Sequence, residues 1–234
     1  LVKVANGGHA IAIELLSPSQ GTYYADLLAM QWIGARNVTD QNVRLQASTM
    51  PEIPTLVKNG MFGEVTSSAQ AMVAINSPHK HVTILGDDGM IQTVHTDGGN
   101  AAGIILRGEQ DHSGVQVHNI TPEAVQRALH AMSKNSISGY GVVVDASHSN
   151  GAAFSGGSKS ASGQTKAAEA TIELMKHPDV GLSVRGLMME CYVHEGTIKD
   201  APTSETYGYS RSDPTLDIDD TIMLLNELAQ VDRG

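Results

Sequence analysis

The sequence predicts an α/β fold in which a parallel sheet, closed or wound, carries helices on its outside. Short apolar runs alternate with helical patterns along all 234 residues. Residues 142–144 form a continuous β-branched run bounded by Gly141, which is typical of a strand buried on both faces. Several such runs end in polar or charged residues, as expected where the carboxyl ends of parallel strands meet.

The first half of the chain is predicted to hold four strands, a further apolar run and two helices. The strands are expected at residues 10–16, 32–36, 55–58 and 80–86, with the further run at 103–106. The helices are expected at 23–31, after a Ser-Pro-Ser start signal at 17–19, and at 67–76. Residues 87–100 are rich in Gly and Asp, so we expect no long element there.

The second half continues the alternation. Thr121 as N-cap and Pro122 at the first helical position predict a helix that ends near residue 135. After the strand at 142–144 we expect a flexible Gly/Ser-rich loop at 149–164, a helix at 166–176, a strand at 183–192, a polar loop at 193–214 and a closing amphipathic helix at 219–231.

Composition limits the class of protein. A hydrophobic content of 41% supports one substantial core, so residues 1–234 are expected to form a single domain. The net charge of -10 argues against a nucleic-acid partner and against a polybasic membrane contact. The single cysteine, Cys191, excludes an intrachain disulfide and, with no apolar run of about 18 residues, indicates a cytoplasmic protein.

Three cations lie at the ends of predicted strands. Arg36, Lys58 and Arg107 each follow or close an apolar run. Cations that converge on one pocket suit a small ligand bearing phosphate and carboxylate, because Arg can bind such groups through two hydrogen bonds. The alternative is that each is an ordinary solvated surface charge.

A second group combines one imidazole with two carboxylates. His148 follows the strand at 142–144, Glu190 closes the apolar run at 183–190, and Asp213 ends the polar loop. Such a set can bind Mn²⁺, Fe²⁺ or Zn²⁺ and leave positions open for a substrate oxygen. The alternative is a hydrogen-bonded histidine with two surface acids, and spacing alone does not decide between them.

Six segments of the chain form an ordered set of motifs. They are Ile33-Gly-Ala-Arg-Asn-Val-Thr-Asp-Gln41, Val57-Lys-Asn-Gly60, Ile104-Ile-Leu-Arg-Gly108, Asp145-Ala-Ser-His-Ser-Asn150, Gly186-Leu-Met-Met-Glu190 with Glu195-Gly196, and Tyr207-Gly-Tyr-Ser-Arg-Ser-Asp213. Through these motifs, which occur in the family's order, the chain from Glu14 onward resembles the C-terminal two-thirds of the class I synthases of 3-deoxy-arabino-heptulosonate 7-phosphate (DAHP), which start the shikimate pathway of aromatic amino acid biosynthesis.

The resemblance implies a TIM-type (β/α) barrel that condenses phosphoenolpyruvate (PEP) with erythrose 4-phosphate or a related aldehyde, whose carbonyl a divalent metal (Mn, Fe, Co or Zn) polarises. The residues implied in PEP binding are Gly34, Ala35, Arg36, Lys58 and Arg107. The implied metal ligands are His148, Glu190 and Asp213, and the implied catalytic residues are Lys58 and His148.

The chain also departs from the family. It has no counterpart of the Gly-Pro-Cys-Ser segment that supplies a cysteine metal ligand, a role that Cys191 cannot take by position, nor of the Lys-Pro-Arg-Thr segment that holds the phosphosugar. The family's Lys-Asn-Gly-Thr-Asp-Gly reads Lys58-Asn-Gly-Met-Phe-Gly63. The PEP half of the site is therefore largely present, and the acceptor half is missing.

Other hypotheses remain open. The chain could be a diverged homologue that uses another acceptor or 2-keto acid, a non-catalytic subunit that binds a metabolite or a partner, or an unrelated barrel enzyme. The resemblance leaves the first two of eight barrel strands unaccounted for, and the chain does not begin with Met. The unpaired edges lead us to expect a homo-oligomer, or further strands in a portion of the protein not represented here.

Overall fold

The structure, a computed structural model, describes residues 1–17, 21–84, 90–199 and 203–232. They divide into two compact units. The first consists of Leu1–Gly60, Glu64–Ile105 and His130–Tyr140, and the second of Met61–Gly63, Leu106–Leu129 and Gly141–Gly234. In the described part of the chain, no helix is both long and apolar enough to span a bilayer.

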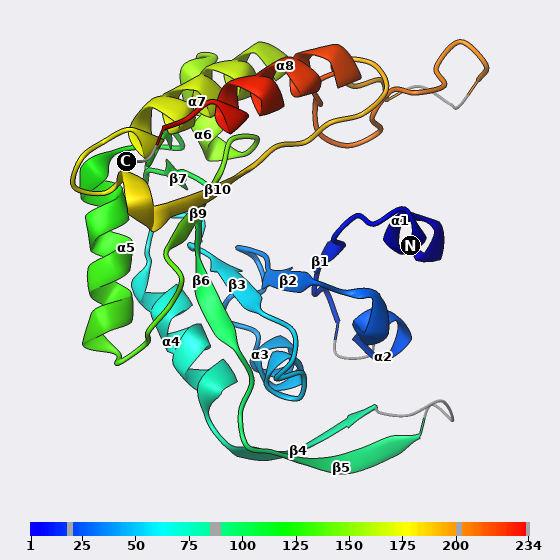
Figure 1. Cartoon of the computed structure of the whole chain (residues 1–234), viewed down its shortest axis with the longest axis vertical. Coiled ribbons are helices and arrows are strands. Elements are labelled where there is room, and N and C mark those ends of the chain that lie inside the picture. Colours follow the sequence, from blue (N-terminus) through cyan, green and yellow to red (C-terminus); the bar gives the residue numbers. More distant parts are fainter. Residues whose placement is uncertain (18–20, 85–89, 200–202, 233–234) are drawn as a thin grey trace. The chain divides into compact units, whose positions relative to one another are not determined.

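The first unit contains a parallel sheet (Figure 1). Its strands, in their order across the sheet, are β1 (Ala12–Glu14), β2 (Met30–Ile33), β3 (Thr55–Lys58) and β6 (Ala101–Leu106). Its helical segments are α1 (Val2–Asn6), α2 (Gly21–Tyr24), η1 (Ala25–Leu27), α3 (Gln41–Ser48) and α4 (Thr66–Asn76). Strands β3 and β6 are buried along their whole length, which agrees with the apolar sequence of β6 and with Leu56 and Val57 at the centre of β3. The parallel order of successive strands confirms the expected α/β class.

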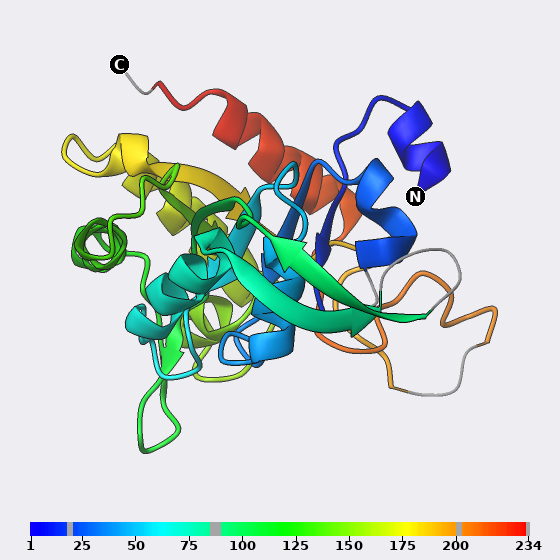
Figure 2. The same cartoon turned by 90° about the horizontal axis from the view of Figure 1, so that it is seen from below.

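A separate hairpin corrects two expectations. Strands β4 (His79–Ile84) and β5 (Ile91–Thr96) pair only with each other and run antiparallel, as Figures 1 and 2 both show. The strand expected at 80–86 is therefore outside the parallel sheet, and its last two residues lie outside the described ones. Residues 91–96, expected to be irregular, form a strand because four of the six are β-branched and find a partner in β4.

The second unit holds the other parallel pair, β9 (Val142–Asp145) beside β10 (Val184–Met188). A short hairpin, β7 (Glu109–Gln110) with β8 (Gln116–Val117), and the turn η2 (Gly181–Ser183) also belong to it. Its helices are α6 (Ser149–Phe154), α7 (Ala161–Met175) and α8 (Ile218–Ala229), and α8 runs beside α7 (Figure 1). Helix α5 (Pro122–Lys134) passes from the second unit into the first, and Thr121 Oγ1 accepts from Ala124 N at 3.2 Å, as its sequence predicted.

The expectation of a flexible loop at residues 149–164 is wrong. Helix α6 and the first turn of α7 occupy most of it, and Ser160 caps α7 by accepting from Gly163 N at 3.0 Å. A Cβ atom at Gly163 would lie 2.3 Å from the carbonyl oxygen of Gly151, so the two helices cross with their backbones in contact. Small residues here serve a cap and a helix crossing, two roles that composition alone does not separate from a loop.

In the first unit, the expected helix and strand bounds between residues 21 and 48 also need correction. The helix expected at 23–31 ends with η1, and strand β2 begins at Met30, so Arg36 lies in a turn beyond the strand. Helix α3 was not expected from the sequence. Its N-cap Asp40 accepts from Asn42 N at 2.9 Å, which stabilises a helix whose other residues carry only a weak amphipathic pattern.

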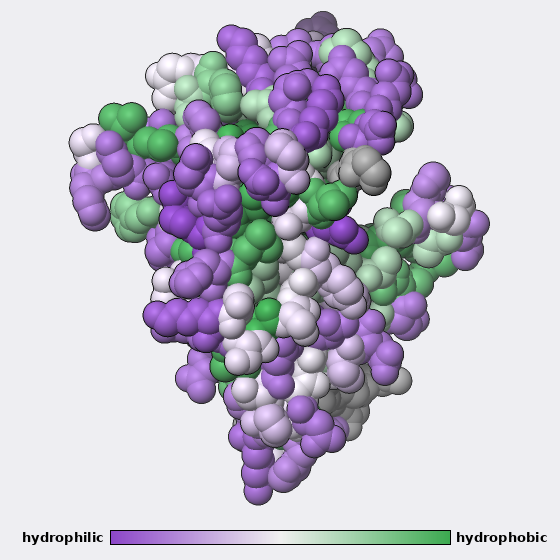
Figure 3. Space-filling view, turned by 60° about the vertical axis from the view of Figure 1, so that its left-hand side comes forward, coloured by the Kyte–Doolittle hydropathy of each residue, from purple (hydrophilic) through white to green (hydrophobic). Residues whose placement is uncertain are grey.

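Some apolar surface stays exposed. On α8, Leu224 is buried, whereas Ile218, Ile222 and Leu225 are about half exposed. Hydrophobic residues also reach the surface in separate patches between hydrophilic ones on the face drawn in Figure 3. Strand β1 pairs with β2 and has no fully buried residue. Such edges and patches are suited to contact with another polypeptide, and the expected oligomer stays a prediction.

Asn150 joins three segments at the carboxyl ends of strands. Its side-chain amide donates to the carbonyl oxygens of Leu106 at 3.1 Å and Asp145 at 2.9 Å, while its Oδ1 accepts from Asn119 N at 2.8 Å. Its backbone N–H donates to the Arg107 carbonyl at 3.1 Å. Because Asn150 is fully buried, these bonds exclude water and fix the backbone that carries Arg107.

We predict that Asn150→Ala lowers the free energy of unfolding by about 2–4 kcal/mol, because it leaves buried backbone groups without partners. Asn135→Ala is the control. The Asn135 side chain makes one bond, to the Ala131 carbonyl at 2.8 Å, at a partly buried helix end, so its loss should cost no more than about 1 kcal/mol. Urea unfolding measures both, and equal values for the two variants would contradict the structural role of Asn150.

Candidate functional site

The second unit brings together three of the residues singled out in the sequence. His148 directly precedes α6, Glu190 lies two residues beyond β10, and Asp213 belongs to the segment before α8. One ligand atom of each lies within 4.8 Å of those of the other two. Since these residues come from three separate loops, the fold rather than local sequence creates the cluster.

The position of His148 depends on Asp145, the last residue of β9. Asp145 is fully buried, and its Oδ2 lies 2.7 Å from His148 Nδ1. Its other oxygen accepts from Ser147 N at 2.9 Å and Ser147 Oγ at 2.8 Å. A carboxylate at Nδ1 favours the proton there and leaves the Nε2 lone pair for a ligand. Nε2 faces Glu190, 3.8 Å from Oε1.

Asp213 is placed beside Glu190 by backbone pairing. Leu216 N donates to the Glu190 carbonyl and Tyr192 N to the Leu216 carbonyl, each at 2.9 Å, which forms a short parallel bridge between Cys191 and Leu216. The carboxylate of Asp213 binds an ammonium group, with Lys159 Nζ 2.5 Å from Oδ2. The cluster therefore already contains one cation.

The donor set fits a divalent metal. Bonds of about 2.0–2.2 Å to nitrogen and oxygen place ligand atoms at most roughly 4.4 Å apart, so a small contraction of the cluster suffices. An imidazole oriented by a carboxylate, together with two acidic residues, is typical of sites for Mn²⁺, Fe²⁺ or Zn²⁺. The ammonium of Lys159 shows that a cation can be held against Asp213.

The residues expected to bind PEP fall into both units. In the first, Gly34, Ala35 and Arg36 lie in the turn after β2, in which Asn37 N donates to the Gly34 carbonyl at 2.9 Å. Lys58 ends the neighbouring strand β3 and is buried, whereas Arg36 is exposed. In the second unit, Arg107 directly follows β6 and is buried. Two buried cations in an acidic chain are unusual, because burial of a charge is costly without compensation.

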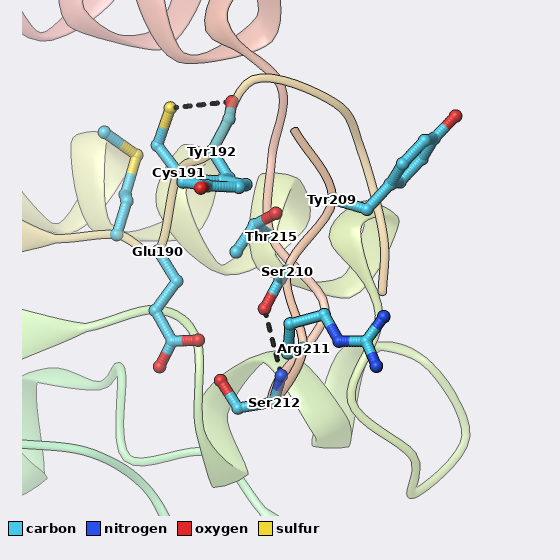
Figure 4. A pocket seen from close by; sticks show the side chains of 9 residues that line it. Glu190, Cys191, Tyr192, Tyr209, Ser210, Arg211, Ser212 and Thr215 are labelled. Carbon is cyan, nitrogen blue, oxygen red and sulfur yellow. Dashed lines mark hydrogen bonds between the residues drawn. The ribbon is translucent and has the colours of Figure 1, made fainter. Parts of the chain in front are cut away.

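A pocket of about 450 Å³ lies next to the cluster, lined by Met189, Glu190, Cys191, Tyr192, Tyr209, Ser210, Arg211, Ser212 and Thr215. Its volume suits a small molecule. Figure 4 shows that the Glu190 carboxylate and the Arg211 guanidinium point to different sides of it. Arg211 donates to the Lys199 carbonyl at 3.0 Å. The pocket thus combines an acidic group, a cation and two tyrosine rings.

Sequence reasoning missed Gln164, Lys159 and Arg211. Gln164 and Lys159 fall in the stretch expected to be a flexible loop, and Arg211 stood in a matching motif without a role. No local pattern marks Lys159, because its partner is 54 residues away. The fully polar run around Arg211 was a usable signal, since it directly precedes a proposed ligand.

Comparisons with known proteins agree with the sequence motifs. The sequence profile of the DAHP synthetase I family matches residues 2–226. The chain is 31% identical to the Tyr-sensitive phospho-2-dehydro-3-deoxyheptonate aldolase of Escherichia coli (strain K12), over 98% of the chain and 60% of that protein. It is also 31% identical to the phospho-2-dehydro-3-deoxyheptonate aldolase of Corynebacterium glutamicum, over the whole chain and 61% of that protein. The chain thus spans about 60% of the length of these curated relatives.

A solved structure shares the fold. The phospho-2-dehydro-3-deoxyheptonate aldolase of Francisella tularensis SCHU S4 superimposes with a TM-score of 0.86 and 28% sequence identity, over 99% of this chain and 64% of that one. This confirms the expected TIM-type (β/α) fold class, and the chain superimposes on part of the solved structure.

The ion pair of Lys159 with Asp213 predicts an effect on cation binding. Both side chains are partly exposed, so solvent screening limits the pair to about 1 kcal/mol or less. Lys159→Gln should therefore tighten Mn²⁺ binding by about two- to fivefold, because the metal no longer competes with the ammonium. Lys176→Gln is the control, since Lys176 pairs with Glu173 on the exposed face of α7. Calorimetric titration with Mn²⁺ measures both, and equal affinities would contradict competition.

Proposed function

Because the chain belongs to the DAHP synthetase I family, as its motifs indicated, we propose that it takes part in a metal-dependent aldol-type condensation of PEP with erythrose 4-phosphate or a related aldehyde. The observation that carries the proposal is the cluster of His148, Glu190 and Asp213, with His148 oriented by a buried carboxylate. The relatives of known name are phospho-2-dehydro-3-deoxyheptonate aldolases.

The proposed metal ligands are His148 through Nε2 and one carboxylate oxygen each of Glu190 and Asp213. A divalent metal bound there supplies a Lewis acid that polarises a carbonyl oxygen. Asp145 holds the His148 ring with its Nε2 toward the cluster. Ser147 Oγ lies 3.1 Å from Glu190 Oε1 and 2.8 Å from Asp145 Oδ1, so its single proton is shared between the two carboxylates. A metal held by Asp213 would compete with the Lys159 ammonium for that carboxylate.

PEP is proposed to bind through Arg36, Lys58 and Arg107, with the backbone at Gly34 and Ala35 close to the ligand. The buried positions of Lys58 and Arg107 favour this role, since charge-assisted hydrogen bonds to phosphate or carboxylate are strongest away from water. Lys58 and His148 are the proposed catalytic residues, the first as a charged donor to PEP and the second as a metal ligand.

The acceptor side of the site is where the sequence departs from the family. The chain has no Lys-Pro-Arg-Thr segment, whereas the pocket beside Glu190 offers Arg211 and two tyrosine rings. This observation favours an aldehyde other than erythrose 4-phosphate as a second candidate, within the same reaction class. A non-catalytic subunit that binds a metabolite has no comparable support, since it needs no metal cluster.

Metal analysis and PEP titration test the function on this chain. We expect wild type to retain Mn²⁺ after gel filtration and His148→Ala to lose it. Lys58→Ala should weaken PEP binding by at least about tenfold, because a charge-assisted contact is worth roughly 1.5–3 kcal/mol. Lys166→Ala, which removes an exposed cation on α7, should leave PEP affinity unchanged.

Two results would contradict the proposal. Near-zero metal content in both wild type and His148→Ala would contradict the assignment of the metal site. Equal PEP affinity in wild type and in the alanine variants of Arg36, Lys58 and Arg107 would contradict the assignment of the PEP site.

A further inference from the structure

The backbone of Glu190 is held by one buried side chain. Gln164 lies in the first turn of α7 and is 1% exposed. Its Oε1 accepts from Glu190 N at 2.5 Å, and its Nε2 donates to the Glu190 carbonyl at 3.1 Å. A single amide thus binds both hydrogen-bonding groups of one residue, and that residue is a proposed metal ligand.

This amide continues the pairing of the sheet where β10 ends. The last hydrogen bond between the β9 and β10 segments joins Ala146 N to the Met188 carbonyl at 2.9 Å. Two residues further on, the Gln164 side chain makes the hydrogen bonds to the Glu190 backbone that a neighbouring strand would otherwise make. Leu216 N also donates to the Glu190 carbonyl. Without Gln164, the Glu190 N–H would lose its partner beside the proposed metal site.

Two glycines bring Gln164 to this position. At the crossing of α6 with α7, Gly163 touches the Gly151 carbonyl, and a Cβ at Gly151 would lie 2.6 Å from the Ala146 carbonyl. Close backbone contacts thus run from the loop that carries His148, through α6, to the residue next to Gln164. These contacts link the backbone of the loop that carries His148 to the helical turn that carries Gln164.

We infer that Gln164 is a positioning residue that sets the Glu190 carboxylate for metal binding. The Glu190 side chain is 31% exposed and contacts Ser147 and His148, so its direction depends strongly on how its backbone is oriented. Metal sites require their ligands within about 0.5 Å of the productive geometry. The effect on metal binding rests on the proposed function, whereas the two hydrogen bonds of Gln164 to the Glu190 backbone, called the backbone clamp below, do not.

The test compares Gln164→Met, which keeps the length but removes both hydrogen bonds, with Gln164→Asn, which keeps the amide but is one methylene shorter. Loss of a residue that orients a metal ligand typically weakens metal binding by about 10–100-fold. We expect a loss of this size in the Mn²⁺ affinity of both variants, measured by calorimetry well below their melting temperatures. The Glu190 amide should also exchange its hydrogen faster in the metal-free variants.

Thr171→Val is the matched control. Thr171 is fully buried on the same helix, and its hydroxyl donates to the Ala167 carbonyl at 2.7 Å, away from Glu190. It should lose stability while it keeps Mn²⁺ affinity within about threefold. A purely structural role of Gln164 predicts that all three variants bind Mn²⁺ alike.

The outcomes separate this inference from the proposed function. Wild-type Mn²⁺ affinity in either folded Gln164 variant would overturn the inference and leave the proposed metal site intact. If wild type itself binds no Mn²⁺, the metal site and the metal role of Gln164 both fall. The hydrogen-exchange rate of the Glu190 amide then tests the backbone clamp alone. Equal rates in wild type and Gln164→Met would overturn the clamp as well.

Discussion

The buried carboxylate of Asp145 is the interaction on which the site depends. A carboxylate without exposure to water is costly unless its oxygens are hydrogen-bonded, and here Ser147 and His148 supply the donors. These bonds fix the turn after β9, and through it the direction of the His148 ring and the hydroxyl that reaches Glu190. Asn150, three residues further along the chain from Ser147, ties the Asp145 carbonyl to the end of β6. The strand end, the imidazole and the neighbouring loop are thus one hydrogen-bonded unit.

Local signals made part of this structure predictable. The buried strand β9 and the capped helix α5 follow from a β-branched run and a Thr-Pro start. The hairpin of β4 with β5 and the crossing of α6 with α7 do not, because each depends on a partner distant in sequence. The same distinction holds in the site. His148 and Glu190 follow strands, and both they and Asp213 stand in recognisable motifs, whereas Gln164 acts through the backbone of a residue 26 positions away.

The relation to the family is uneven along the chain. The profile covers nearly all of it, yet the chain spans about 60% of the length of its curated relatives. Most of the proposed site residues lie near the carboxyl ends of strands, where a barrel concentrates its chemistry. Around the cluster, Lys159 and Arg211 add cations from segments that join these ends. The electrostatic character of the site therefore comes partly from its connecting loops.

The ion pair of Lys159 with Asp213 also bears on how the protein reaches its folded state. Clustered carboxylates repel each other, and in many metalloproteins the metal must arrive before the site can form. Here an internal ammonium already neutralises one of the acids. Loading of the proposed metal would therefore replace one cation at Asp213 with another, and would not have to bring together carboxylates that all lack a counter-charge.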